Sequence, residues 1–329
     1  MEVKNVKVTP ANDITAGEKM EFDLCNVDNS FANGLRRVML AEIPILAVDT
    51  VTVRTNTSVF FDEMVVHRLA MVPWDSITAN DWADEDEIVF DLKVRCPSDL
   101  HSRRVTTADL PAVYWRGQTH VKPIAVGDGI WLLTLGRGQE FDCKCTIKRG
   151  IAKLHSKWMA VSTVAMRYAA DIRLNPKGFA ALPEEHRRLW VNRCPVNVFA
   201  HNDNTGQVEV VNKAACIFCK ECLTIDPPFN ELPAPLVSMR QKKDEWGQFD
   251  FHFTVESTGQ LPVVELVRRA VLVLRKKLED IREGLKESQK GGTGHLPTRP
   301  IGIAPTTVRV VNEDVVHRGR DDDLSHLQH

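Results

Sequence analysis

The chain has 329 residues, of which 43% are hydrophobic, and its formal net charge is −2. This length and apolar content predict two or three domains with substantial cores. The nearly balanced charge excludes a globally basic nucleic-acid-binding protein, so that any contact with DNA is expected to be indirect or local. The N-terminal stretch lacks the apolar segment of a signal peptide, and no apolar run of roughly 18 residues occurs, which predicts an intracellular protein without membrane contact.

The first helix of the chain is predicted to begin near Ser30, whose hydroxyl can cap the first turn. One face of this helix carries the apolar residues Phe31, Leu35, Val38 and Met39. The opposite face carries Arg36 and Arg37, which either contact a partner or are solvated. The preceding residues, up to about 25, contain short segments of strand type.

The next part of the chain is predicted to be rich in strands. Alternating segments occur at 47–54 and 89–96, on either side of a short helix near 60–70. Residues 130–148 resemble a β-hairpin that turns at Gly136–Gly138. Within it, Cys143 and Cys145 share the apolar face of an alternating strand, so both thiols are predicted to be small core side chains.

Four other cysteines have the spacing of a metal centre. Cys216, Cys219 and Cys222 are separated by two-residue gaps, and Cys194 precedes a proline. In bacterial ferredoxins a triplet with these gaps and a distant Cys-Pro supply the thiolates of iron–sulfur clusters. The pattern predicts a 4Fe–4S cluster, with tetrahedral zinc as an alternative. A vestigial site without cofactor, or disulfides, are the remaining alternatives.

A long helix is predicted after Pro262. Its apolar residues alternate in spacing between three and four, which makes a straight seam typical of helix–helix packing. These residues are Val264, Val267, Val271, Leu274, Leu278, Ile281 and Leu285. Leu266, Ala270 and Val273 widen the apolar face, so one side is expected to meet the chain's own sheet and the other a partner. The alternative is a helix packed only on its own domain.

Motifs of several common enzyme classes are missing from the sequence. The chain has no GxxxxGKS/T phosphate loop, no HExxH and no GxSxG. The sequence therefore predicts a non-catalytic protein. The alternative from another class is a ferredoxin-domain oxidoreductase component, which would need a second cofactor site.

Several segments together resemble one protein family. Residues 29–44 (NSFANGLRRVMLAEIP) and 56–73 (NTSVFFDEMVVHRLAMVP) are similar to the signature of the RNA polymerase alpha-like subunits. Supporting segments are 135–140, 150–158, 253–259 with the helix after it, and the four cysteines, which resemble the ferredoxin-like insert of the archaeal members of this family. The resemblance extends over roughly residues 15 to 287.

The resemblance implies an α+β fold with a dimerisation domain that is split in the sequence. The two parts would be residues 1–46 and 241–288. Between them would lie an inserted mostly-β domain at 47–170 and a ferredoxin-like cysteine domain at 171–240. Residues 289–329 are predicted to be a mobile tail, because this segment is rich in Gly, Pro and Asp.

The resemblance also implies a role and partners. The chain would be an assembly platform of DNA-directed RNA polymerase that pairs with a smaller alpha-like subunit and docks the two largest subunits. It looks most like the third-largest subunit of RNA polymerase II, which is nuclear. The alternatives are the alpha-like subunit shared by polymerases I and III, and the archaeal alpha-like subunit, which would be cytoplasmic. The partner interface would include Phe31, Leu35, Arg36, Arg37, Val38, Val267, Val271, Leu274, Leu278 and Ile281.

One departure from the polymerase II pattern concerns zinc. Many such subunits have a zinc-binding cysteine loop before the second strand of the inserted domain. The corresponding interval here, Trp74 to Ile88, contains no cysteine. No zinc site is therefore expected in this interval.

Overall fold

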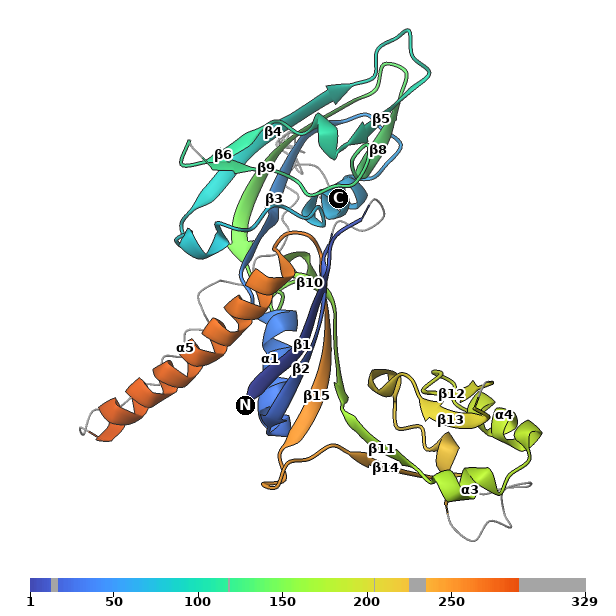
Figure 1. Ribbon diagram of the computed structural model, residues 1–329. Coiled ribbons are helices and arrows are strands. Elements are labelled where there is room, and N and C mark those ends of the chain that lie inside the picture. Colours follow the sequence, from blue (N-terminus) through green and yellow to red (C-terminus); the bar gives the residue numbers. More distant parts are fainter. Residues whose placement is uncertain (13–16, 118, 204, 225–234, 290–329) are drawn as a thin grey trace, which may run out of the picture.

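The computed structural model describes residues 1–12, 17–117, 119–203, 205–224 and 235–289. This part of the chain combines helices with several small antiparallel sheets, which confirms the predicted α+β class. Figure 1 shows a strand-rich body at the top, a sheet with two helices in the middle, and a small unit on a two-stranded ribbon at the lower right. Among the described helices, none is both long enough and apolar enough to cross a bilayer.

A four-stranded antiparallel sheet forms the middle body. Its strand order is β1 (Glu2–Thr9), β2 (Lys19–Val27), β15 (Phe249–Ser257) and β10 (Val161–Tyr168). Three of these strands are far apart in the sequence and meet only in the folded chain. The rings of Phe22 and Phe253, directly opposite in the register, stack with their centroids 5.2 Å apart.

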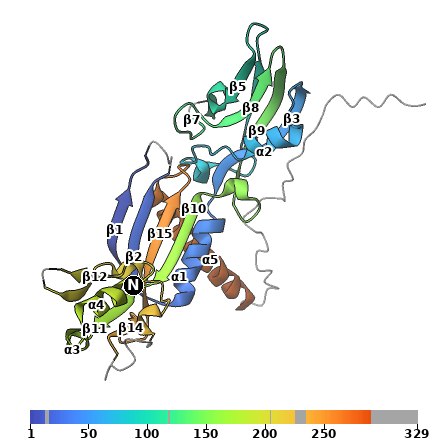
Figure 2. The same ribbon diagram turned by 90° about the vertical axis from the view of Figure 1, so that its right-hand side faces the viewer.

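Two helices cover one face of this sheet, as Figure 2 shows. They are α1 (Asn29–Ala41) and α5 (Val263–Gln289). Leu35 and Met39 of α1 and Leu266 and Ala270 of α5 are buried together with the inner side chains of the sheet. The N-cap of α1 is Asp28, whose Oδ2 accepts from the Ser30 amide at 2.9 Å, so the prediction that Ser30 caps this helix is wrong.

The strand-rich body, called the β-domain below, spans about residues 45–158. Its main sheet has the order β3 (Ile45–Asn56), β9 (Glu140–Gly150) and β4 (Glu87–Arg95). Two strand pairs and one helix accompany it: β5 (Ser102–Thr106) with β8 (Trp131–Gly136), β6 (Val113–Trp115) with β7 (Thr119–Val121), and α2 (Asp62–Ala70). Cys143 and Cys145 are fully buried in its core, which confirms their predicted packing role.

The third unit, called the cysteine insert below, spans about residues 170–241. Strands β11 (Ala170–Leu174) and β14 (Val237–Gln241) pair to form the ribbon that joins it to the sheet. Beyond the ribbon lie α3 (Pro176–Ala180), α4 (Glu184–Asn192) and the pair β12 (Phe199–Asn202) and β13 (Gln207–Val210). Trp190 packs between Phe179 and Phe199 at centroid distances of 4.8 and 4.7 Å, which gives the insert its own small core.

The β-domain is attached to the sheet by polar contacts at the start of α5. Arg269 is buried, and its guanidinium donates to the carbonyl oxygens of Ser76 at 3.2 Å and Ile77 at 2.6 Å. Its Nε also donates to Glu265 at 2.8 Å. The amide of Ser76 in turn donates to the carbonyl of Gln260 at 3.0 Å. These bonds fix the loop after α2 against the first turns of α5.

The structure corrects two predictions about strand pairing. The strands of the predicted 130–148 hairpin exist, but β8 pairs with β5, whereas β9 lies between β3 and β4. Residues 161–168 are predicted to belong to the inserted domain at 47–170, yet β10 pairs with β15 in the four-stranded sheet. Two strands that follow each other in the sequence therefore need not pair with each other. The predicted tail at 290–329 lies outside the described residues.

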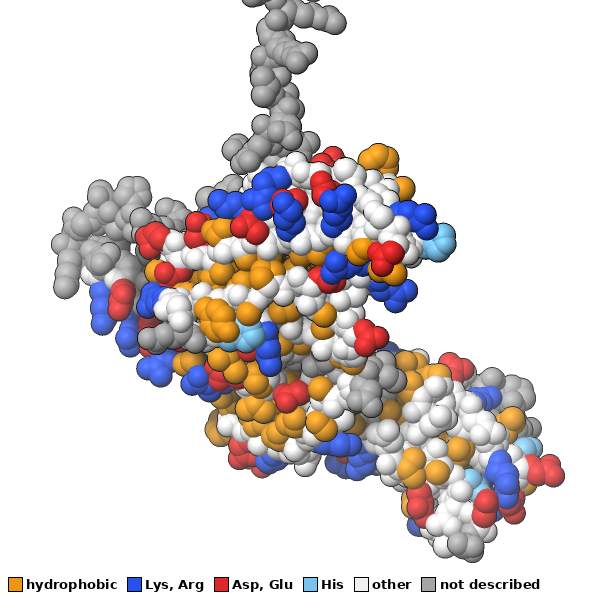
Figure 3. Space-filling model, turned by 90° about the horizontal axis from the view of Figure 1, so that it is seen from above, with side chains coloured by type: hydrophobic (Ala, Val, Ile, Leu, Met, Phe, Trp, Pro, Cys, Tyr) orange, Lys and Arg blue, Asp and Glu red, His pale blue; other side chains and the backbone are white. Residues whose placement is uncertain are grey.

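Charged side chains of both signs are interspersed on the described surface. Figure 3 shows this on the face seen from above, where lysines and arginines alternate with aspartates and glutamates. Such mixing agrees with the formal net charge of −2. Apolar side chains are exposed between them, and two of these apolar areas define candidate sites.

Candidate subunit interface and cysteine site

A groove lies between α1 and α5 near the N-terminus of the chain. It is open to solvent and has a volume of about 360 Å³. The residues that line it are Met1, Phe31, Val271, Leu274, Arg275, Leu278, Glu279 and Arg282. Four of the predicted interface residues, Phe31, Val271, Leu274 and Leu278, therefore meet around one groove.

The exposed face of α5 continues this groove along the helix. Leu278 is 63% exposed, and Val271 and Ile281 are each about half exposed. Leu266 and Ala270, on the other side of the helix, are fully buried. The helix thus has two apolar sides, one packed on its own sheet and one open, as the widened apolar face predicted. In Figure 1 its C-terminal half extends beyond the sheet.

The remaining predicted interface residues differ in exposure. Leu35 and Val38 are buried in the chain's own core beneath α1, so the prediction that they line a partner interface is corrected. Phe31 is 37% exposed at the start of the same helix. Arg37 is exposed, whereas Arg36 is partly buried and donates to the Asn33 side chain at 3.0 Å.

Val267 and Leu274 occupy the boundary between the two sides of α5. Both are partly buried and pack against the sheet core. One turn after Leu274, the ammonium of Lys277 donates to the carboxylate of Glu42 at 2.6 Å, which links α5 to the C-terminal end of α1. The groove is therefore lined by two helices that are packed and bonded to each other.

A second apolar surface, called the α2 surface below, was missed by the sequence analysis. Val59 and Phe61, just before α2, are 80% and 74% exposed, and Met64 on the helix is half exposed. Nearby, the Arg68 guanidinium lies 4.9 Å from the centre of the Trp131 ring. The signal in the sequence was the apolar run Val59-Phe60-Phe61 directly before a helix start. Neighbouring exposed apolar side chains are typical of interaction surfaces.

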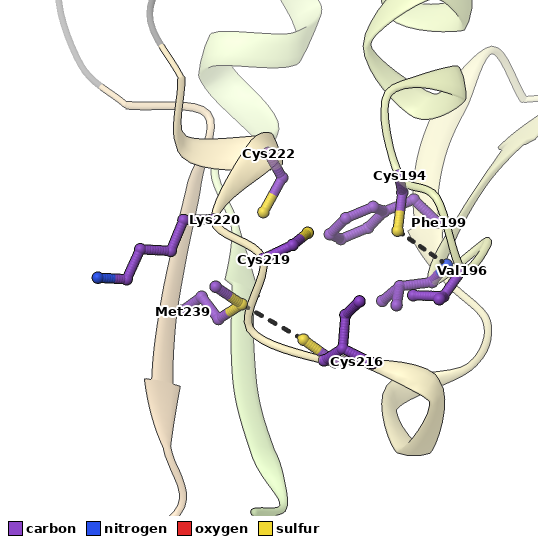
Figure 4. A pocket seen from close by; sticks show the side chains of 10 residues that line it. Cys194, Val196, Phe199, Cys216, Cys219, Lys220, Cys222 and Met239 are labelled. Atoms are coloured by element: carbon purple, nitrogen blue, oxygen red, sulfur yellow. Dashed lines mark hydrogen bonds between the residues drawn. The ribbon is translucent and has the colours of Figure 1, made fainter.

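The four predicted ligand cysteines line one pocket in the cysteine insert. Cys194 approaches from the segment after α4, and Cys216, Cys219 and Cys222 come from the loop before β14. Figure 4 shows their sulfur atoms around a shared space, with Met239 of β14 at its rim. All eight cysteines of the chain are free thiols, so no disulfide joins the four cysteines here.

The backbone next to these cysteines adopts an unusual conformation. Phe218 and Lys220 lie between the cysteines of the triplet, and both have left-handed φ angles, of 55° and 67°. Asn197, three residues after Cys194, has a φ of 51°. Such angles cost non-glycine residues of order 1 kcal/mol or more each. These residues bend the chain beside the cysteines that line the pocket.

Without a bound cation, the surroundings of the pocket favour neutral thiols over thiolates. Burial, reinforced by the neighbouring cysteines, raises the pKa of Cys222 to about 11. Burial also raises the pKa of the Cys216 thiol. The pocket is also lined by the apolar side chains of Val196 and Phe199. A bound metal would remove this penalty, because it pairs thiolate charge with positive charge.

The donor set of the pocket suits a thiophilic metal centre. Thiolates are ligands both of structural zinc and of iron–sulfur clusters, and four of them complete either kind of centre. Within the described residues, the side chains of His, Cys, Asp and Glu nowhere converge as three or more ligands of one metal ion. The four cysteines supply the ligand type of a thiophilic metal centre, although their side chains do not converge as metal ligands in this structure.

Comparison with known families gives the class of protein. The family model described as the RNA polymerase Rpb3/Rpb11 dimerisation domain matches residues 21–278. This match covers most of the chain, including α1, the two inserted units, strand β15 and the first part of α5. The chain therefore belongs to the RNA polymerase alpha-like subunit family.

Individual relatives agree with this family. The chain is 33% identical over 300 residues to a conjugation stage-specific protein of Tetrahymena thermophila, covering 82% of this chain and 92% of the relative. It is 31% identical over 282 residues to the RNA polymerase II subunit rpb3 of Dictyostelium discoideum, covering 81% and 91%. The archaeal subunit Rpo3 of Methanosphaera stadtmanae is 26% identical over 295 residues, covering 87% and 100%. Subunits of polymerases I and III are also similar.

Proposed function

We propose that this chain is a non-catalytic assembly subunit of a nuclear RNA polymerase of the polymerase II type. It pairs with a smaller alpha-like subunit through the groove and the open face of α5, and it docks the two largest subunits. DNA is contacted only through the complex. The observation that carries the proposal is the exposed apolar face of α5 beside the groove, in a chain whose relatives include polymerase II subunits.

The groove supplies the driving force for pairing. Val271, Leu278 and Ile281 expose apolar area that a partner helix would remove from water. Burial of such area contributes about 25 cal/mol per Å², from which the costs of association are subtracted. Arg275, Glu279 and Arg282 line the rim and can form polar contacts there. An apolar centre with a charged rim is typical of stable subunit interfaces.

The α2 surface is proposed as the docking site of one large subunit. It lies in the β-domain, whereas the groove lies beside the four-stranded sheet, so both surfaces can be occupied at once. Val59 and Phe61 would act as apolar anchors, and the Arg68–Trp131 pair would lie at their edge. Arg37 is exposed on α1 and is proposed to form an ion pair with an acidic side chain of a large subunit.

Affinity purification of tagged full-length chain from native extract tests the assembly role. We expect a small alpha-like subunit and the two largest subunits of polymerase II to co-purify, identified by mass spectrometry. Recovery of the chain only as a free monomer would contradict the proposal. Recovery of the largest subunits of polymerase I or III instead would assign it to the shared type.

We further propose that the four cysteines of the insert bind a 4Fe–4S cluster, with zinc as the alternative. Cys194, Cys216, Cys219 and Cys222 would hold it, and the cluster would cross-link the loop before β14 to the segment after α4. The insert has only a small core, so metal–thiolate bonds would supply much of its order. This role is structural and needs no electron transfer.

Metal analysis and limited proteolysis test the cluster. Protein purified without oxygen should contain iron and sulfide and absorb visible light, whereas zinc alone would favour the alternative. Cys219→Ser should abolish the metal and give new cleavage confined to 171–240. Cys25→Ala is the matched control, because Cys25 lies in the sheet and should change neither result. Wild-type protein without metal, and with the same cleavage as Cys219→Ser, would show the site to be vestigial.

The oxidoreductase alternative is distinguished by the same preparation. A ferredoxin-domain component would pass electrons from the cluster to a second redox centre or a partner outside the polymerase. The groove and the α2 surface favour the assembly role. If the iron-loaded chain reduced a redox partner and was absent from purified polymerase complexes, the oxidoreductase alternative would replace the assembly role.

A further inference from the structure

The first strand of the chain is an exposed edge of the four-stranded sheet. Strand β1 pairs with β2 on one side, and no described strand pairs with its other side (Figure 2). All eight residues of β1 are exposed, including the three valines Val3, Val6 and Val8. An edge strand presents a row of backbone N–H and C=O groups without partners in the sheet, and this row is a template for pairing with a further strand.

One face of β1 continues the apolar layer of the sheet. The register with β2 shifts by one residue in the middle of β1, so Val3 and Val8 share a face although they are five residues apart. They lie opposite Leu24 and Met20, which are buried in the core between the sheet and its two helices. Val3 and Val8 themselves are 54% and 43% exposed. The apolar layer thus extends onto β1, beyond the part that the helices cover.

This apolar face meets the groove at the start of the chain. Met1 precedes Val3 by two residues, the spacing at which side chains of an extended chain share a face. Met1 lines the groove together with Phe31 and Val271. A subunit that fills the groove therefore meets the start of β1. Strand β1 lies outside residues 21–278, which the dimerisation-domain model matches, so a contact there would add to the interface of the shared domain.

The opposite face of β1 carries the two lysines Lys4 and Lys7. Lys4 pairs with Glu2 at 2.6 Å. Lys7 lies opposite Glu21 of β2, whose carboxylate pairs with Lys19 at 3.0 Å. Lys7 can therefore pair with an acidic side chain of a neighbouring strand. A strand that is apolar on one face and acidic on the other would match both faces of β1.

We propose that the small alpha-like subunit adds an extended strand to the free edge of β1. This inference rests on the proposed pairing through the groove. The added strand bonds to the backbone of β1, places apolar side chains next to Val3 and Val8, and places an acidic side chain next to Lys7. Strand addition of this kind obtains affinity from main-chain hydrogen bonds and specificity from alternate side chains. It also covers valines that the isolated chain leaves in water.

Hydrogen exchange of the full-length chain, alone and with the recombinant small subunit, tests the inference. In the heterodimer we expect the amides at 3–8 that exchange fast in the isolated chain to slow at least about tenfold, because an added strand bonds to them. The matched control is β10, the opposite edge of the same sheet, whose amides should change less than about twofold. A heterodimer whose β1 amides exchange as in the isolated chain would overturn the inference and leave pairing through the groove intact.

The substitution Val3→Asp gives an independent measurement. Because Val3 is about half exposed, the isolated chain should remain folded, whereas the Kd of the heterodimer should rise about tenfold. Val211→Asp, in the cysteine insert and 59% exposed, is the matched control and should change the Kd about twofold at most. Val8→Asp replaces the first variant if that one unfolds. Wild-type affinity of a folded variant would overturn the inference.

Two further outcomes would assign the edge to another occupant. Slowing at 3–8 that depends on the concentration of the chain alone would assign it to a second copy. Slowing that appears only when the largest subunits are added would assign it to one of them. Either outcome overturns the inference. Failure to form any heterodimer would contradict the proposed function itself, and the inference with it.

Discussion

The substitution Leu278→Asp addresses the central claim about α5. Leu278 is 63% exposed and lines the groove, so its side chain contributes little to the stability of the isolated chain. Arg275 and Arg282 lie at spacings of three and four residues from it, where they can pair with a new carboxylate. We therefore expect the free energy of unfolding of the isolated chain to change by less than about 0.5 kcal/mol.

Pairing with the small alpha-like subunit should respond much more strongly. Full burial of a leucine contributes about 1.5–3 kcal/mol, so burial of the exposed two-thirds would contribute about 1–2 kcal/mol. The aspartate forfeits this contribution and adds the cost of desolvating a carboxylate, which brings the loss to about 3–4 kcal/mol or more. The Kd of the heterodimer should rise at least about 100-fold. Leu278→Ala, without the charge, should raise it about 5- to 30-fold.

Titration calorimetry with the recombinant small subunit measures the change in Kd. The matched control is Leu272→Asp, on the same helix and 45% exposed, but outside the residues that line the groove. It should change the Kd of the heterodimer about twofold at most. Wild-type affinity of Leu278→Asp would refute the reasoning. So would a large loss of stability in the isolated chain, because the side chain would then pack internally.

Three predictions concern the joints of the fold. Arg269→Leu leaves the carbonyls of Ser76 and Ile77 without their donor and removes one of the two arginines that bond Glu265, and it should lower the free energy of unfolding by about 3–5 kcal/mol in chemical denaturation. Hydrogen bonds from Arg268 and Arg269 hold the pKa of Glu265 at about 2, below its ordinary value of 4.5. Because this pKa is depressed, the carboxylate stabilises the fold above pH 4.5, and about 2–3 kcal/mol should be lost as the pH falls from 4.5 towards 2. Glu265→Gln should remove that part of the pH dependence, and an unchanged acid profile would contradict the assignment. Gly150→Ala would place a Cβ 2.2 Å from the buried Trp158 ring, and should cost about 1–3 kcal/mol, measured as a lower Tm. An unchanged Tm would show that the ring can move aside.

Local patterns in the sequence predicted the elements that depend on periodicity. The three–four spacing after Pro262 predicted α5, and strict alternation predicted β9 with Cys143 and Cys145 inside. These predictions succeeded because the side-chain direction in a helix or strand repeats with a fixed period. The two-residue gaps of the cysteine triplet likewise predicted residues that do line a common pocket.

The partners of these elements could not be predicted from local pattern. The seam residues of α5 look alike in sequence, yet Val267 and Leu274 pack partly on the sheet while Leu278 is open. Residues 130–148 read as a hairpin, yet β8 and β9 join different sheets. Strand β10 reads as part of the β-domain, yet it pairs with β15. In each case the choice depends on which apolar faces can be buried together, and that is a property of the whole chain.

The sequence by itself thus determined the elements with a clear hydrophobic period, the cysteine motif and, through resemblance, the family. Tertiary structure alone decided that α1 turns Leu35 and Val38 inward, that a groove opens beside Leu278, and that Met239 comes to lie beside Cys216. The physical reason is the range of the interactions. Helix and strand periods arise between near neighbours in the chain, whereas burial and sulfur contacts join residues that only long-range packing brings together.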